Sequence, residues 1–224
     1  QTQAGFSIGG PIIKDKLFFF ANYEISRRSD LGSNVVANDG DGTTGVNESR
    51  VLETDLIAVS NALMGLGYNT GAYQGFKHNS DSNKGIIKLD WNINDNNKLS
   101  VFYNFLDASK DKPAHPTALG FRGPNASIMQ FEKSGYQINN ELDSFLIELN
   151  SKISEKVSNK FQGGYTHFND YRIPFSTPAP VINIQDGAGS NYIIAGHEPF
   201  SINNTLDQKV FQFTDNLSYT VGSH

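Results

Sequence analysis

The sequence contains no cysteine, which excludes disulfides, thiolate metal sites and cysteine nucleophiles together. It also lacks any run of about 18 consecutive apolar residues, so no helical membrane span is expected. Charged residues make up only 18% of the chain and the net charge is −5, so no basic stripe is present to bind nucleic acid. Transmembrane strands are compatible with these absences, because their alternating side chains keep mean hydropathy low.

No catalytic constellation stands out either. No histidine has a partner at the spacing of a metal site or a catalytic triad, so we expect neither an enzyme nor a cofactor. The five histidines are scattered at His78, His115, His167, His197 and His224. Asp39 and Asp41 resemble the start of a calcium loop, but Arg50 stands where the bidentate glutamate would be. We interpret this segment as an exposed turn, and a cation site is the weaker alternative.

What the chain does contain is a repeated alternation of apolar and polar residues. In the clearest run, residues 85–93, Ile87, Leu89 and Trp91 share one face, while Lys88 and Asp90 share the other. The same pattern predicts seven strands, at about residues 4–12, 17–27, 85–93, 99–106, 144–153, 160–172 and 211–221.

The connections between these strands alternate strictly in length. Short turns fall at residues 14–16, 94–97 and 154–159, and long connections at residues 28–84, 107–143 and 173–206. All short turns therefore lie at one end of the sheet and all long connections at the other. This layout is typical of outer-membrane barrels, which have short periplasmic turns and long extracellular loops.

One long connection carries a helical signal. Leu52, Leu56, Val59 and Leu63 recur at helical spacing, which predicts one short amphipathic helix within residues 48–66. We expect it to pack inside the loop, with a ligand-contacting lid as the alternative. Loop aromatics could stack on a sugar or peptide, or could anchor the loops onto one another. They are Tyr68, Tyr73, Phe76, Phe121 and Tyr192.

The fold expected from these patterns is all-β: a partial, antiparallel, up-and-down transmembrane β-barrel. Strands survive in lipid only in a closed barrel, and an odd number of strands indicates a piece of a larger one. The apolar face would contact lipid, with Tyr23, Trp91, Tyr103 and Tyr219 in the interfacial girdle. Asp215 interrupts this face, so we expect it near or above the outer interface, on the side of the long loops.

Four charged side chains are expected on the opposite, lumen-lining face. Glu24, Lys88, Asp90 and Glu148 alternate with the apolar residues of their strands. There they would hold a plug and water, or contact a solute directly.

Three segments resemble a known family: GGPIIKDKLFFF (residues 9–20), KGIIKLDWNIN (residues 84–94) and EPFSINNTLDQ (residues 198–208). They are similar to segments of TonB-dependent receptors, specifically of the Oar-like branch common in Bacteroidota. The resemblance implies a barrel of about 22 strands in the outer membrane of a Gram-negative bacterium, which takes up a solute past a plug. Residues 1–224 would form the N-terminal part of the barrel domain, after a signal peptide, a carboxypeptidase-regulatory-like domain and a plug.

The same resemblance implies a set of partners. They are outer-membrane lipid, the plug, the remaining barrel strands, TonB through an upstream segment, and a surface lipoprotein that could cap the barrel. Two other functions stay open at this point. One is a surface adhesion or assembly protein whose barrel anchors ligand-binding loops. The other is a soluble β-sandwich, which would need a second sheet to cover the apolar faces.

Overall fold

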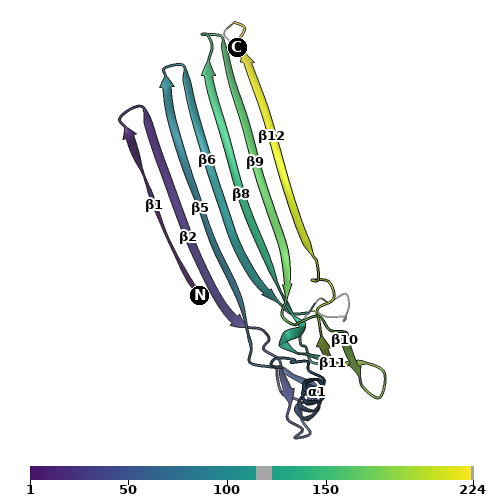
Figure 1. Cartoon of the computed structure of the whole chain (residues 1–224). Helices are drawn as coiled ribbons and strands as arrows, with labels where there is room; N and C mark the ends of the chain where they lie inside the picture. The colour runs from purple at the N-terminus through teal and green to yellow at the C-terminus, as the bar shows by residue number, and fades with distance from the viewer. Residues whose placement is uncertain (115–122, 223–224) are drawn as a thin grey trace.

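The computed structural model describes residues 1–114 and 123–222. Its main feature is one seven-stranded antiparallel sheet in the order β1-β2-β5-β6-β8-β9-β12 (Figure 1). The strands are β1 (Thr2–Ile13), β2 (Leu17–Leu31), β5 (Lys77–Asn94), β6 (Asn97–Lys112), β8 (Tyr136–Lys152), β9 (Val157–Pro174) and β12 (Thr205–Tyr219). The prediction of seven up-and-down antiparallel strands is confirmed. The sheet is not closed, because β1 and β12 are its two edges.

These strands are longer than the alternation predicts. β5 has 18 residues and begins at Lys77, eight residues before the expected start. The added segment, residues 77–84, pairs with residues 24–31 of β2, from Glu24 opposite Lys84 to Leu31 opposite Lys77. Both faces of that segment are polar, so it carries no alternating signal. The sheet thus continues past its apolar part toward the long connections.

The three short turns lie together at one end of the sheet, at the top of Figure 1. In the first, Lys16 N donates to Ile13 O at 3.0 Å, and Asp15 adopts a left-handed conformation with φ of 60°. In the second, the Asn94 side chain accepts from Asn96 N at 3.0 Å. Such residues favour tight turns because their side chains bond the local backbone. The predicted alternation of short turns and long connections is therefore confirmed.

The cross-strand register gives the sheet one apolar face. Leu17, Trp91, Leu99, Leu149 and Phe161 follow one another across five strands in a single row. This face is open: Phe213 is 73% exposed, and no second sheet covers it in the described part of the chain. A soluble sandwich would bury such residues, so the sandwich interpretation is not supported.

Asp215 lies on this apolar face, opposite Phe161. It is four residues from Tyr219, the last residue of β12, and therefore close to the short turns. The predicted position near the outer interface, on the side of the long loops, is wrong, because β12 begins at Thr205 and not at residue 211. Its carboxylate accepts a hydrogen bond from Asn159 Nδ2 at 2.8 Å, which supplies a polar partner on the same face.

At the other end, the three long connections fold together into a second unit, which we call the loop body (Figure 1). It contains β3 (Val36–Asn38), β4 (Glu48–Leu52), α1 (Glu53–Gly65), β7 (Met129–Gln130), the 3-10 turn η1 (Glu132–Ser134), β10 (Val181–Gln185) and β11 (Asn191–Gly196). β10, β11 and β7 form one small sheet, and β3 pairs with β4. The long connections therefore carry short strands in addition to the predicted helix.

The loop body has its own hydrophobic core. Residues from all three connections are buried in it: Val51, Leu56, Met129, Phe131, Ile193 and Ala195. The predicted helix is confirmed as α1, whose Leu56 enters the core while Val59 and Leu63 pack against it. Among the described residues, no helix combines the length and the apolar character needed to cross a membrane.

Candidate functional site: the polar face and the loop body

Near the short turns, the polar face of the sheet carries a compact cluster of charges. Lys88 Nζ lies 2.9 Å from Asp90 Oδ2 and 5.0 Å from the centre of the Phe102 ring. Ser100 Oγ donates to Asp90 Oδ1 at 2.6 Å. Ser100 in turn pairs with Glu148, so the register brings Lys88, Asp90 and Glu148 into one band.

Glu148 is the best-connected carboxylate of this band. It lies 3.0 Å from Lys160 Nζ and accepts hydrogen bonds from Gln162 Nε2 and Asn150 Nδ2, both at 2.7 Å. The negative charge of Glu148 is therefore balanced by Lys160 on the neighbouring strand. The charged groups of this band therefore pair with one another on the polar face of the sheet.

Glu24 is not part of that band. Phe18 is the residue of β2 that lies opposite Asp90, and Glu24 is six residues further toward the loop body. Glu24 instead lies 2.7 Å from Lys84 Nζ and accepts from Gln3 Nε2 at 3.0 Å. Three of the four predicted lumen residues are thus brought together, and the fourth forms a separate ion pair.

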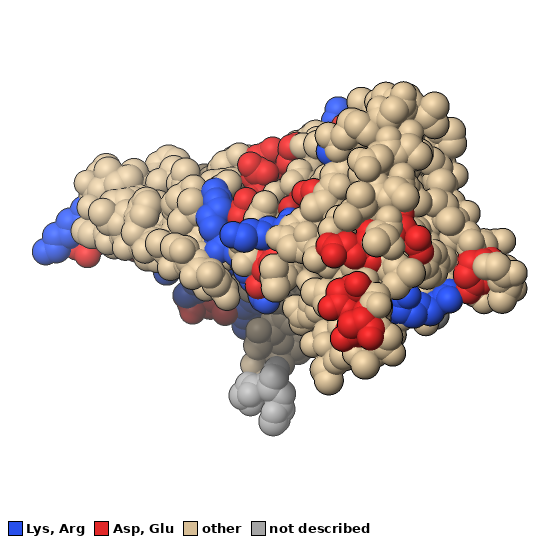
Figure 2. All heavy atoms as spheres, turned by 90° about the horizontal axis from the view of Figure 1, so that it is seen from below, with Lys and Arg blue, Asp and Glu red and all other residues tan. Residues whose placement is uncertain are grey.

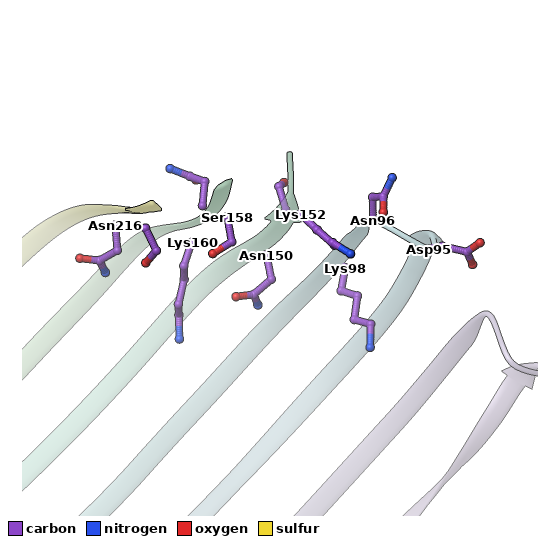
Figure 3. Close-up of a pocket in the computed structure, with 11 residues that line it drawn as sticks. Asp95, Asn96, Lys98, Asn150, Lys152, Ser158, Lys160 and Asn216 are labelled. Carbon is purple, nitrogen blue, oxygen red and sulfur yellow. The ribbon is translucent and has the colours of Figure 1, made fainter. Parts of the chain in front are cut away.

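A hollow of about 430 Å³ lies between this band and the short turns (Figure 3). Its lining is almost entirely amine, amide and hydroxyl: Asp95, Asn96, Lys98, Asn150, Ser151, Lys152, Ser158, Asn159, Lys160, Asn216 and Ser218. Lys152 pairs with Glu155 and Lys160 with Glu148, whereas Lys98 has no ion pair with a described residue. Such a surface suits carboxylates and other polar acceptors on a partner.

The turn around Asp39 and Asp41 is held by its own backbone. Asp41 N donates to Asp39 Oδ1 at 3.0 Å, and Thr43 donates to Asp41 Oδ1 through both Oγ1 and N at 2.7 Å. These two Thr43 hydrogen bonds lower the pKa of Asp41. In residues 1–114 and 123–222, no three acidic or histidine side chains are grouped as metal ligands. His115, Phe121 and His224 lie outside the described residues.

Within the loop body, Arg50 joins all three long connections. Its guanidinium lies 2.7 Å from Asp186 Oδ2 and donates to the carbonyls of Ser127 at 3.1 Å and Asn191 at 3.0 Å. It also lies 5.2 Å from the centre of the Tyr192 ring. The Ser190 amide and the Arg50 guanidinium hold the pKa of Asp186 below its ordinary value. Sequence reasoning missed this role, because the partners lie 77, 136 and 141 residues from Arg50 along the chain.

Of the loop aromatics, Tyr192 joins two connections, whereas Tyr73 bonds within its own connection. Tyr192 OH donates to Asp55 Oδ2 at 2.9 Å and accepts from Leu52 N at 2.8 Å, and burial raises the pKa of Tyr192. Tyr73 OH donates to Glu53 Oε1 at 2.5 Å. Phe76 is buried, and Tyr68 is half-buried with a pKa raised by that burial.

A groove of about 680 Å³ runs along the loop body between α1 and the end of β10. Helix α1 contributes Asp55, Ala58 and Val59. The remaining lining residues are Arg50, Leu52, Ile184, Gln185, Asp186, Gly187, Tyr192 and Ile193. The wall is therefore mixed, with aliphatic side chains beside two carboxylates, Asp55 and Asp186, and one arginine that pairs with Asp186. Its volume falls within the range of small-molecule sites.

Comparison with known proteins identifies a family and a solved structure that share this architecture. A family model described as "Outer membrane beta barrel domain" matches residues 1–41 and 49–224. Among solved structures, the outer membrane transporter YddB from Escherichia coli is similar, with a TM-score of 0.56 and 11% identity over 98% of this chain. This chain covers 23% of that chain. At such low identity the likeness concerns the fold alone. The comparison with curated proteins found no match.

Proposed function

This chain belongs to the outer membrane beta barrel domain family and lies in the outer membrane, and from that premise we propose that it forms part of the wall of a TonB-dependent transporter. The transporter would take up a solute through a plugged β-barrel. The single observation that carries the proposal is the contrast between the two faces of the sheet: one is apolar and uncovered, and the other carries a balanced band of charges.

The apolar face fits a position against lipid. On β8, Phe145, Ile147 and Leu149 form an apolar run between Asp143 and Ser151. From Asp143 to Ser151 the strand advances by eight steps, or about 26 Å along the strand, which is about 20 Å of bilayer at the tilt of barrel strands. The Tyr103 hydroxyl donates to Asp143 at one edge of this band, and Trp91 lies in the last apolar row at the other. Both positions suit an aromatic girdle.

The polar face fits a position around a plug. The hollow beside Lys98 and the band of Lys88, Asp90 and Glu148 would contact the plug and the water around it. Most of these side chains already have partners in the wall, which favours a role in holding the plug over direct substrate binding. The short turns would then face the periplasm, and the loop body would face the outside of the cell.

The finer assignments belong to this proposal as well. The three motif segments favour the Oar-like branch of Bacteroidota, a barrel of about 22 strands, and a TonB-contacting segment and plug in the whole protein. Lipid, the remaining strands and a capping surface lipoprotein are the other partners that this branch suggests.

Binding of TonB by the full-length protein tests the proposal. We expect the purified receptor in detergent to bind the isolated periplasmic domain of TonB, and a variant without its TonB-contacting segment to lose that binding. A receptor that shows no interaction with TonB would exclude energised transport.

The second candidate is a surface adhesion or assembly protein, and the observation that favours it is the folded loop body, whose charged residues are mostly acidic. This function predicts that cell-surface attachment survives deletion of the TonB-contacting segment. Transport predicts that the activity is lost with that segment.

A further inference from the structure

One edge of the small sheet in the loop body is open. β10 pairs with β11 on one side and with no other described strand. Open strand edges are rows of unpaired main-chain donors and acceptors, which natural proteins usually cover. The end of this edge reaches the groove, because Ile184 and Gln185 of β10 line the groove together with Ala58 and Val59 of α1, whereas Val181 and Asn183 lie further along the edge.

The register shows which main-chain groups are available. Phe131 N donates to Ile194 O at 3.1 Å, so the main-chain groups of Ile194 turn toward β7 and away from β10. Those of Ile193 and Ala195 therefore face β10, opposite Ile184 and Ile182. By alternation, the N–H and C=O groups of Val181 and Asn183 point outward, and no described residue bonds to them.

The loop body as a whole carries an excess of negative charge. The described part of the loop body contains eight acidic residues and two basic ones. The acidic residues are Asp39, Asp41, Glu48, Glu53, Asp55, Glu132, Asp186 and Glu198, and the basic residues are Arg50 and Lys133. Figure 2, which looks onto this end, shows red side chains gathered there with few blue ones. Asp186 is neutralised by Arg50, whereas Asp55 lines the groove with a tyrosine hydroxyl but no cation among its partners.

We propose that the open edge of β10 and the groove at its end together bind one extended peptide that carries lysine or arginine, and that this peptide adds to the edge as a strand. Main-chain hydrogen bonds to Val181 and Asn183 would give affinity, and the basic side chain would pair with Asp55. β10 has five residues, so it offers an edge of about 16 Å. The proposal names a ligand class for the capture step of the proposed transporter and so rests on that function.

The experiment measures peptide binding to the full-length receptor in detergent, without TonB. The probe is a pool of fluorescent heptapeptides with alternating threonine or valine and two lysines, and a matched pool carries glutamate in place of lysine. We expect the lysine pool to bind and the glutamate pool to bind about tenfold more weakly. Replacing Asp55 by Asn should weaken the lysine pool about threefold, since the pair is partly exposed.

Two variants at one position isolate the main-chain contribution. Asn183→Pro removes the outward N–H of the edge, and Asn183→Ala removes the same side chain but keeps the N–H. Proline is tolerated on edge strands, so both variants should fold. We expect binding to fall about tenfold in Asn183→Pro and to stay unchanged in Asn183→Ala.

Equal binding by the two variants, or no binding of the lysine pool at millimolar concentration, would overturn the peptide site. Neither result depends on whether the receptor binds TonB. A receptor that binds TonB but no peptide refutes this inference alone, and one that binds peptide but not TonB refutes the transport proposal alone.

Discussion

Arginine placed at two adjacent residues of β8 tests the assignment of the two faces. Ile147 lies in the middle of the apolar run of that strand, and Leu146 points to the polar face. The two positions share one strand and one depth, so Ile147→Arg and Leu146→Arg differ only in the medium that receives the charge.

The expected magnitude follows from the depth of Ile147. It is four residues from Asp143 and four from Ser151, which places it about 10 Å from either edge of the apolar band. An arginine facing lipid near the bilayer midplane costs about 2 to 4 kcal/mol. We expect Ile147→Arg to lose this amount, a factor of about 30 to 900 in the unfolding equilibrium. Leu146→Arg should lose less than about 1 kcal/mol, because its charge reaches water.

The measurement is a urea titration of the full-length barrel folded into lipid vesicles. The wild type and both variants are compared at the same lipid composition. If Leu146→Arg were as destabilising as Ile147→Arg, or more so, the face assignment would be refuted, and with it the placement of Glu148 and Lys88 on the lumen side.

Three further predictions concern the loop body. Arg50→Met removes the contacts that join the three long connections, so limited proteolysis should cut all three connections faster while the strands stay protected. The pKa of Asp186 is lower in the folded protein than its ordinary value of 3.8, so the ionised carboxylate stabilises the fold fully above pH 3.8. That stabilisation is lost as the pH falls from 3.8 through the folded-state pKa. Hydrogen exchange in residues 181–196 should therefore accelerate below about pH 4 in the wild type, and Asp186→Asn should abolish that dependence. Gly196→Ala should destabilise β10–β11 by about 1 to 3 kcal/mol, seen by hydrogen exchange, because the new Cβ would lie 2.0 Å from Pro180 O at a φ of +91°.

The sheet was predictable because its signal is local. Alternation along residues 85–93 depends only on which medium each face meets, and the Asn-rich turn at residues 94–97 bonds to its own backbone. The strand ends were not predictable, because residues 77–84 are polar on both faces and pair only through their register with β2. The misplacement of Asp215 has the same cause, since the start of β12 is also polar.

The candidate sites were likewise predictable only where their signal is local in the sequence. Lys88 and Asp90 are two residues apart on one strand, so the sequence alone places them on the same face. Their position beside Ser100 and Glu148 depends on how β5, β6 and β8 pair. Apart from helix α1, the loop body could not be predicted. Its core joins Val51, Met129 and Ile193 from three connections, in strands as short as two residues, so no single segment carries the pattern.

The loop body depends on the sheet for its order. Its core is small, and its segments come from connections whose ends the seven strands hold in place; Gly32 N, directly after β2, still donates to Phe76 O, directly before β5, at 2.9 Å. Because the sheet fixes these ends, closing the connections costs less conformational entropy than it would in a free chain. The groove beside β10 is therefore formed before a ligand arrives, and a peptide would not have to order the loops to bind. The same reasoning predicts that the three connections, excised from the sheet, neither fold nor bind, so the groove and the membrane wall act as one structural unit.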